Sequence, residues 1–488
     1  MVDFLIEEGF DGWLDNVLAP ITDKVNDIVL FSIPLTDSIE IPVVVALLLI
    51  SAVFFTISFR FINIGMFKHA IDVVRGKYDN PDDEGEVSHF QALTAALSGT
   101  VGIGNIGGVA IAVSTGGPGA TFWMILAGIF GMTTKFVECT LGVKYRNIYN
   151  DGTVSGGPMY YLQKGLAKRN LPRFGRFLAV FFAIACAGAA IGSGGPAQVN
   201  QATEQMIAIT GGENGFLYGN GWMFGLVMAG IVALVIIGGI KSIVKVTERI
   251  VPFMVGIYLL AAFVVLFAHA DDIIGAIGTI ISEAFTMKAG IGGFVGVMIV
   301  GLTRSAYSNE AGLGSASIAH SAVKTDEPLS EGLVALLEPF IDTVVVCTIT
   351  ALVIVVTNNY DPNATEGISL TSKAFGSVIT WFPYVLSVAV ILFALSTMVA
   401  WAYYGLKAWT FLFGENKTAD LIYKVLFCVA VVIGSSLSLK AMFSLADALV
   451  LLMAFPNLIG LYFLFPDVAK EVRSYKQRLR DGIIKKMK

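Results

Sequence analysis

The sequence is poor in charge, cysteine and histidine, and its low charge has the widest consequence. Only 14% of its 488 residues are Asp, Glu, Lys or Arg, whereas a soluble domain contains about 25%. Hydrophobic residues make up 55%, and the mean hydropathy is +0.75. A soluble enzyme or a nucleic-acid-binding protein needs more charge on its surface, and a disordered chain contains fewer apolar residues. The composition therefore predicts a polytopic membrane protein.

The few cysteines and histidines argue against two kinds of site. The four cysteines, Cys139, Cys186, Cys347 and Cys428, lie in or beside apolar stretches and form no Cys-X-X-Cys pair. We expect free thiols packed in membrane helices. The four histidines are scattered along the chain, so no transition-metal site is predicted. No His-rich cluster or triad signature indicates an enzyme.

Long apolar segments dominate what the sequence does contain. A membrane helix needs about 20 mostly apolar residues. Eleven such segments are predicted, with limits near 41–59, 90–113, 118–141, 177–209, 222–240, 250–268, 291–311, 333–356, 376–404, 421–438 and 442–465. The expected fold is all-α, with 11 transmembrane helices.

The distribution of Lys and Arg predicts the orientation of these helices. With the N-terminus outside, 27 of the 32 basic residues fall in segments on the inner side and four fall outside. Basic residues favour cytoplasmic loops, so we expect a multi-pass plasma-membrane protein with its C-terminus in the cytoplasm. Residues 466–488 form a basic tail that meets membrane lipid.

Residues 1–40 differ from the rest, with nine acidic residues and one basic residue. Apolar side chains in this leader repeat with helical spacing. They are Phe4, Leu5, Phe10, Trp13, Leu14, Val17 and Leu18. We expect an extracellular amphipathic helix on the membrane surface; a frayed acidic leader is the alternative.

Glycine is concentrated in two of the predicted spans. The second span reads Ser98-Gly-Thr-Val-Gly-Ile-Gly-Asn-Ile-Gly-Gly108, and the seventh holds Gly290 to Gly293 and Gly301 to Gly314. Five glycines in eleven residues weaken a helix in the middle of a span. Each of these two spans is the first of five consecutive predicted spans, which cover residues 90–268 and 291–465. Residues 41–89 hold an extra helix and an inner loop. Because five is odd, the second run starts on the opposite side of the membrane, which predicts an inverted repeat.

Paired interrupted helices are typical of a secondary transporter's binding site, as in the LeuT fold. Unwinding exposes backbone groups that lipid cannot satisfy but that a solute can. N–H groups at a helix end attract a carboxylate, and free carbonyl oxygens suit a hard cation. Close helix packing through glycine is the alternative explanation. A channel is less consistent with the sequence, because it would show a repeated filter motif.

Four motifs resemble one transporter family. They are the Ser98–Gly108 stretch, Gly116-Gly-Pro-Gly-Ala-Thr-Phe-Trp-Met124, Ser155-Gly-Gly-Pro-Met-Tyr-Tyr161 and Ser308-Asn-Glu-Ala-Gly-Leu-Gly314. Together they resemble the alanine or glycine:cation symporters, also called sodium:alanine symporters, from about residue 40 to 470. The resemblance implies a LeuT-type core of ten helices plus one N-terminal helix. It also implies uptake of L-alanine and glycine driven by Na⁺, with D-alanine as a further candidate substrate. No other metal and no nucleic acid are expected to bind, and the protein is expected to function as a monomer. Coupling to H⁺ or transport of another small neutral solute is the alternative.

The resemblance assigns candidate residues at the first break. Gly99, Thr100, Val101 and Gly102 are the expected unwound segment, whose N–H groups would meet the substrate carboxylate. Val101, Gly104 and Asn105 are candidate sodium ligands through carbonyl or amide oxygens. An interhelix hydrogen bond is the alternative role of Asn105.

Other spans complete the predicted site. Ser396 and Thr397 of the ninth span are candidate side-chain sodium ligands, although hydroxyls often bond back to their own helix. Trp401 lies one turn further on and is expected to limit the pocket to a small side chain; a membrane-interface position is the alternative. Substrate contacts are also expected from Gln198, with Asn200 and Gln201 as alternatives, and from Gly301, Ser305 and Asn309.

Several charged residues lie within predicted spans, where charge often indicates function. Lys135 and Glu138 in the third span, and Glu338 and Asp342 in the eighth, are interpreted as inner-gate or packing pairs. Arg304 and Glu310 bracket the second break and are expected to lock it. Asp447 is left without a role.

Overall fold

The fold is helical, with two short hairpins, over the part of the chain that the computed structural model describes. That part comprises residue 24 and residues 29–36, 39–285, 293–360, 367–437 and 448–486. The expected leader helix at residues 4–18, and Asp447, lie outside it. The last residues of the leader form an antiparallel hairpin, β1 (Ser32–Thr36) with β2 (Ile39–Pro42), and not a helix. The second hairpin pairs β3 (Asn147–Ile148) with β4 (Val154–Ser155).

Each of the eleven predicted segments overlaps one or more helices. In chain order these are α3 (Val43–Ser58), α6 (His89–Thr100) with α7 (Gly107–Gly116), α8 (Ala120–Lys144), α10 (Pro172–Ala189) with α11 (Pro196–Ile209), α12 (Gly221–Ile236), α13 (Gly239–Ala268), α15 (Gly293–Asn309), α17 (Pro328–Ala335) with α18 (Leu337–Pro339) and α19 (Thr348–Val356), α21 (Phe382–Phe413), α22 (Lys417–Gly434) and α24 (Ala454–Arg480). Two π-helical turns interrupt these spans, η2 (Ala190–Gly194) and η5 (Phe340–Cys347).

Short helices connect the long ones. They are α4 (Ile62–Gly65), α5 (Phe67–Val74), α9 (Pro158–Lys168), α14 (Ile273–Glu283), α16 (Ala316–His320) and α20 (Gly367–Gly376), with 3₁₀ turns η1 (Ile103–Asn105), η3 (Gly212–Asn214) and η4 (Ala270–Asp272).

Length and composition support a multi-pass membrane protein. Among the described residues, six helices are long and apolar enough to cross a membrane, or seven if α6 and the segment after it count as one bent span. Helices α3 and α12 are apolar but shorter, at 16 residues each. The prediction of eleven spans therefore stays a prediction, as does the inverted repeat.

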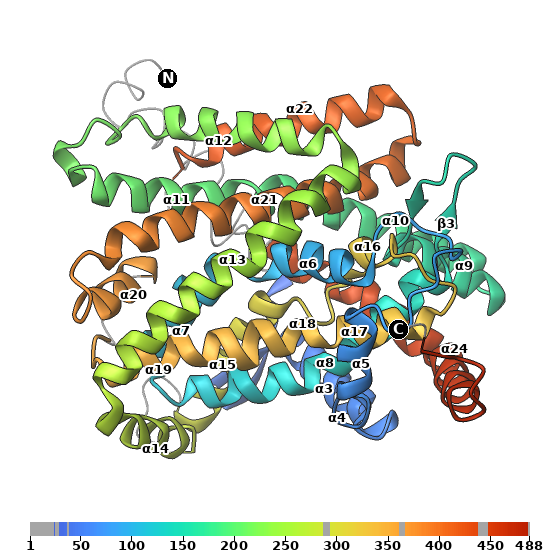
Figure 1. Ribbon diagram of the computed structural model, residues 1–488, viewed down its shortest axis with the longest axis horizontal. Coiled ribbons are helices and arrows are strands. Elements are labelled where there is room, and N and C mark those ends of the chain that lie inside the picture. The colour runs from blue at the N-terminus through green and yellow to red at the C-terminus, as the bar shows by residue number, and fades with distance from the viewer. Residues whose placement is uncertain are drawn as a thin grey trace.

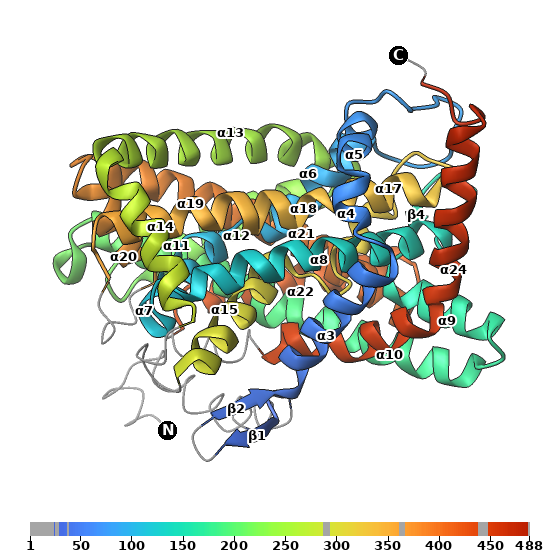
Figure 2. The same ribbon diagram turned by 90° about the horizontal axis from the view of Figure 1, so that it is seen from below.

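Many of the long helices run along the long axis of the molecule, whereas α24 runs across it, and different elements lie at the two ends. In Figures 1 and 2, α9 and α24 lie at the right end, whereas α14 and α20 lie at the left end. We call these the α9 end and the α14 end. The basic residues assign segment 143–176 and the tail from residue 466 to the cytoplasmic side, and residues 143–176 and 466–486 both belong to the α9 end.

Small residues on α8 bring three elements close to it. Gly128 lies against Thr343 of η5, Gly131 against Ala311 after α15, and Gly142 against Ser317 of α16. A side chain at any of these glycines would meet a neighbour at 3.0 Å or less. Small residues allow membrane helices to approach closely, and α8 thereby holds both flanks of the second break.

Candidate functional site

The first glycine-rich span is broken, as the sequence predicted, but over a shorter segment. A capping box formed by Ser88 and Gln91 starts α6. Helix α6 ends at Thr100, and the axis of the following segment, Ile103–Gly116, is turned by 61°. Val101 and Gly102 are extended. Gly99 and Thr100 therefore belong to the last turn of α6 and not to the unwound segment.

The side chain of Asn105 fixes the geometry of this break. Its Oδ1 accepts a hydrogen bond from the Gly102 N–H at 2.8 Å. Its Nδ2 donates to Asp342 Oδ1 of η5 at 2.7 Å and to Ser308 Oγ of α15 at 3.2 Å. Asn105 thus makes the interhelix hydrogen bonds that were the alternative to sodium binding, and the Gly102 N–H is already engaged.

The second break lies after α15, at residues 310–315. Glu310 (φ 54°), Gly312 (φ 98°) and Gly314 (φ 84°) have left-handed backbone conformations. Only glycine adopts such conformations at little cost, so Glu310 is strained there. Its carboxylate accepts a hydrogen bond from Ser315 Oγ. Helix α15 runs unbroken through Gly301 and Ser305 to Asn309, so Gly301 and Ser305 do not flank an unwound segment as the sequence suggested, whereas Asn309 directly precedes the second break.

A cavity of about 100 Å³ lies where the two breaks meet. Its walls come from the first broken span, η2, α11, α15, the second break, α21 and the residues before α24. The lining residues are Gly99, Thr100, Gly102, Ile103, Gly104, Gly108, Ser193, Gly194, Ala197, Gln198, Gln201, Arg304, Tyr307, Glu310, Thr397, Trp401 and Val450. Seven of the predicted site residues are among them: Gly99, Thr100, Gly102, Gly104, Gln198, Thr397 and Trp401.

Two buried oxygen atoms in the cavity wall have no hydrogen-bond partner among the described residues, Gln198 Oε1 and Thr397 Oγ1. A methyl group placed on Gly102 would lie 2.7 Å from Thr397 Oγ1 and 3.7 Å from Gln198 Oε1, so both oxygens face the unwound segment. Burying a polar atom without a partner costs roughly 1–3 kcal/mol. A ligand that donates to these oxygens, or a cation that they coordinate, would remove that cost.

Trp401 forms a wall of the cavity. It is buried, with 3% of its surface exposed, so it is not a membrane-interface residue. Its side chain packs directly on Gly194, where a methyl group would overlap the ring. Tyr404 lies edge-on to it, with ring centroids 5.8 Å apart. The tryptophan is thus fixed from two sides, and the cavity cannot enlarge without moving α21.

Six predicted residues lie outside this cavity. Gly301 packs against Trp123 of α8. Ser305 and Asn309 line a separate cavity of about 30 Å³ beside α3 and α8. Ser396 Oγ donates to the Phe393 carbonyl at 2.9 Å, which is the local bond expected as its alternative role. Val101 and Asn105 are fully buried behind the lining residues.

Several lining residues were not predicted as ligands. Arg304 and Tyr307 are three residues apart and so share the cavity face of α15. Glu310 reaches the cavity from the second break. The charges of Arg304 and Glu310 at membrane depth were a usable signal, although the sequence suggested only that they lock the break. Ser193 and Gly194 reach the cavity through the π-helical turn η2, which nothing in the sequence indicated.

The other charged residues pair differently from the sequence prediction. Lys135 does not pair with Glu138 but with Glu338, whose Oε1 lies 3.0 Å from Lys135 Nζ. Glu138 Oε1 accepts from Asn457 Nδ2 at 2.6 Å. Asp342 accepts from Asn105, Ser308 and Thr343. Each residue therefore links α8 or η5 to another helix.

Comparison with known proteins identifies a transporter family. The sequence model of the sodium:alanine symporter family matches residues 27–488. The sodium/alanine symporter AgcS of Methanococcus maripaludis is 40% identical over 440 residues, which are 89% of this chain and 94% of that protein. The amino-acid carrier protein AlsT of Bacillus subtilis is 34% identical over 432 residues, or 88% of each chain.

A solved structure supports the fold. The crystal structure of MhsT in complex with L-phenylalanine matches with a TM-score of 0.51 at 13% identity. The match covers 78% of this chain and 99% of that one. At this identity the likeness concerns the fold alone, which is of the LeuT type.

Proposed function

Because the chain belongs to the sodium:alanine symporter family, we propose that it couples Na⁺ entry to the uptake of small neutral amino acids, L-alanine first among them. Its relatives are transporters and not enzymes. Glycine and D-alanine are further proposed substrates, and alternating access between the two sides of the membrane is the proposed mechanism. The proposed unit of transport is the monomer.

One observation carries this proposal: two oxygens without a hydrogen-bond partner among the described residues, Gln198 Oε1 and Thr397 Oγ1, face the unwound Gly102 in the cavity between the two breaks. A zwitterionic amino acid and a sodium ion together supply what these groups lack. The ammonium group donates hydrogen bonds, and Na⁺ coordinates neutral oxygens. A neutral apolar solute would leave both oxygens unsatisfied.

We assign the sodium site to Thr397 Oγ1 and to backbone carbonyls of the first break, including those of Val101 and Gly104. Ser396 is the weaker candidate, because its hydroxyl already bonds to Phe393. Asn105 serves this site by holding the break in shape, since its amide oxygen is bound to the Gly102 N–H.

We assign the substrate to the remaining cavity. Gln198 faces the ammonium or carboxylate group, and backbone groups of the first break that Asn105 does not engage face the carboxylate. Arg304 and Glu310 supply one charge of each sign to the wall, which suits a zwitterion. The volume of about 100 Å³ is well below the roughly 300–1,000 Å³ of drug-sized sites, and Trp401 prevents its expansion. Both features favour a methyl side chain over a larger one.

The test is uptake of labelled L-alanine by the purified protein in proteoliposomes. The arms are an imposed Na⁺ gradient, the same gradient with K⁺ in place of Na⁺, and a pH gradient alone. Thr397→Val keeps the shape but removes the unpartnered hydroxyl, and Ser396→Ala is its matched control one residue away. A hydrogen bond to a charged group contributes about 1.5–3 kcal/mol, so Na⁺-driven uptake by Thr397→Val should fall by about tenfold or more, with Ser396→Ala close to wild type.

Each other result has a specific meaning. Equal loss in both variants would move the sodium site away from Thr397. Uptake driven equally by protons without Na⁺ would replace the coupling ion and keep the solute. No alanine or glycine uptake under any gradient would exclude the proposed substrate class.

A further inference from the structure

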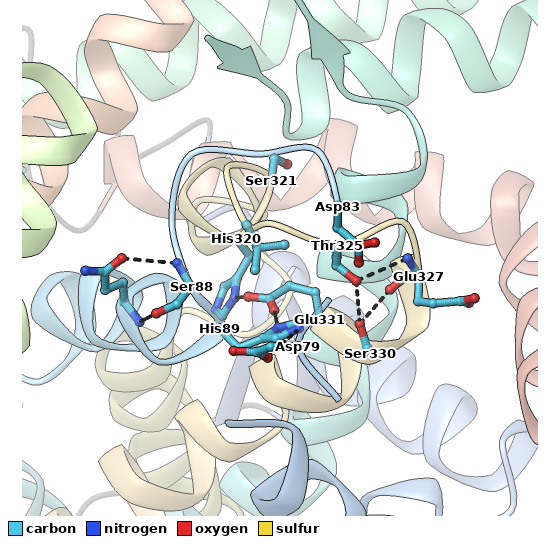
Figure 3. Close-up of polar contacts among 12 residues, drawn as sticks. Asp79, Asp83, Ser88, His89, His320, Ser321, Thr325, Glu327, Ser330 and Glu331 are labelled. Carbon is cyan, nitrogen blue, oxygen red and sulfur yellow. Dashed lines mark hydrogen bonds and ion pairs between the residues drawn. The ribbon is translucent and has the colours of Figure 1, made fainter. Parts of the chain in front are cut away.

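A chain of titratable side chains connects the α9 end of the molecule with the cavity. It starts at Asp79, whose side chain is 44% exposed and whose Oδ1 lies 3.9 Å from His89 Nε2. His89 is the first residue of α6, and its Nδ1 meets Glu331 Oε2 of α17. The other oxygen of Glu331 lies 2.5 Å from His320 Nδ1. Figure 3 shows the two imidazoles on either side of the Glu331 carboxylate, with Asp79 beside His89.

The chain continues from His320 toward the second break. His320 Nε2 lies 3.7 Å from Glu338 Oε2, and Glu338 Oε1 lies 3.0 Å from Lys135 Nζ. Lys135 in turn attracts the carboxylates of Glu310 and Glu138. Glu310 lines the cavity, so the network reaches from a surface carboxylate to the wall of the substrate cavity.

The geometry around His320 favours its protonated form. The side chains of His320, Glu331 and Glu338 are all 0% exposed. A neutral imidazole with its proton on Nδ1 donates to Glu331 but presents a bare nitrogen to Glu338. Neither His320 Nε2 nor Glu338 Oε2 has a hydrogen-bond partner within the described part of the chain. A second proton, on Nε2, turns the contact between His320 Nε2 and Glu338 Oε2 into an ion pair. It also places a positive charge between the buried carboxylates of Glu331 and Glu338.

Titratable and charged groups on the elements around His320 influence whether its imidazole is protonated. Carboxylates outnumber the other charges near it. The titratable and charged groups are Asp79 between α5 and α6, His89 at the start of α6, Lys135, Glu138 and Cys139 in α8, Arg146 after α8, Tyr161 in α9, Glu310 at the second break, Glu331 and Glu338 in α17 and α18, and Tyr403 and Tyr404 in α21.

The position of this cluster decides what a proton there would do. His89 is the first residue of α6, the half-helix between the α9 end and the first break. Glu331 ties that residue to α17 and, through His320, to α16 beyond the second break. The cluster therefore fastens the α9-side halves of both interrupted spans to each other. An opening of the cavity toward the α9 end that moves α6 relative to α17 separates His89 from Glu331.

We propose that His320 and its neighbours His89, Glu331 and Glu338 form a proton-binding site that keeps the α9-side half of the first broken helix closed. Protonation holds the closed arrangement. Loss of the proton removes the counter-charge that His320 gives to Glu331, while Glu338 keeps its ion pair with Lys135, and α6 is released. Since this arrangement favours the charged imidazole, closure persists at neutral and acidic pH and is lost as pH rises. The proposal deepens the proposed function, because it adds a regulating ion to the same broken helix.

The experiment measures the position of α6 directly and needs neither substrate nor a sodium gradient. Spin labels on Phe90→Cys in α6 and Arg173→Cys in α10 report their distance by pulsed electron paramagnetic resonance. Phe90 is 42% exposed, and Arg173 is exposed. Cys428→Ser removes the one native cysteine that is not fully buried. Distances are recorded in liposomes equilibrated from about pH 6 to about pH 10, a range chosen to include the titration of a stabilised imidazolium.

Two of the four histidines of the chain belong to the proposed site, and the other two serve as matched controls. His320→Gln and His89→Gln remove the proposed site. His69→Gln and His269→Gln change histidines that bond elsewhere, to Tyr475 and to the Val265 carbonyl. We expect a single short distance at pH 6 and a growing longer population at alkaline pH in wild type and in both controls. Each site variant should show the same distribution at every pH.

Two results would overturn the proposal. One is a wild-type distance that does not change with pH. The other is a pH response of wild-type size in both His320→Gln and His89→Gln. If His320→Gln fails to fold, His89→Gln and the wild-type profile still decide the question. Absence of alanine uptake in a separate assay would count against the proposed substrate and not against this site.

Discussion

At the scale of single residues, Gly301 illustrates how the same glycine can have two explanations. It belongs to the glycine-rich seventh span that was predicted to be interrupted, and the sequence suggested a contact with the substrate. In the structure Gly301 lies inside the continuous helix α15, where a methyl group would be 2.7 Å from Trp123 Cβ and 3.2 Å from the Met124 nitrogen. Its partner is about 180 residues away in the chain, so no local pattern could reveal it.

Gly301→Ala should therefore destabilise the protein, because the added methyl group overlaps α8. Overpacking of a tight contact costs about 1–3 kcal/mol. Gly230→Ala in α12 is the matched control, since nothing lies within 4 Å of the methyl group there, and replacing a helical glycine by alanine gains about 0.5–1 kcal/mol. Thermal unfolding in detergent should show a lower Tm for Gly301→Ala and an unchanged or higher Tm for Gly230→Ala. Equal Tm values would mean that α8 and α15 can separate without cost.

At the scale of elements, the sequence predicted that two spans break but not where each break begins and ends. Glycine content located the first break to within a few residues. The second lies at residues 310–315 and not within α15, although α15 contains Gly293, Gly296 and Gly301, because Glu310 is held in a left-handed conformation by contacts that a composition cannot encode. The π-helical turns η2 and η5 were not predicted, since no residue type marks them. They nonetheless bring Ser193 to the cavity and Asp342 to Asn105.

The Asn105–Asp342 contact joins these elements, so its loss should affect the first break as a unit. Asn105→Ala removes a donor from a buried carboxylate and the acceptor of the Gly102 N–H. A hydrogen bond to a charged group contributes about 1.5–3 kcal/mol. We expect a lower Tm than for Asn200→Ala, whose amide donates only to the neutral carbonyls of Gly434 and Leu437.

The double variant Asn105→Ala/Asp342→Asn separates charge from packing. It should be more stable than the sum of its single variants predicts, because no unpaired charge remains buried. Additive losses, measured by the same unfolding assay, would show that Asp342 is satisfied without Asn105.

At the scale of the whole molecule, composition alone predicted the class, and hydropathy predicted segments that all overlap helices. The reason is physical: lipid requires continuous apolar helices whatever the details of packing. The site was only partly predictable. Residues of the first break and α21 were recognised by their motif, whereas Arg304 and Tyr307 reach the cavity because of how α15 rotates against its neighbours. That rotation depends on contacts between distant segments.

The orientation in the membrane is the remaining prediction at this scale. Basic residues assign the α9 end to the cytoplasm, and residues 143–176 and 466–486 share that end in the structure (Figure 2). In intact cells, a membrane-impermeant maleimide should label Asp271→Cys, which is exposed in η4 near α14, but not Lys168→Cys, which is exposed at the end of α9. Both should react after permeabilisation. The reverse pattern would place α6 and its histidine cluster on the outer side, so that external rather than internal pH would control the release of that half-helix.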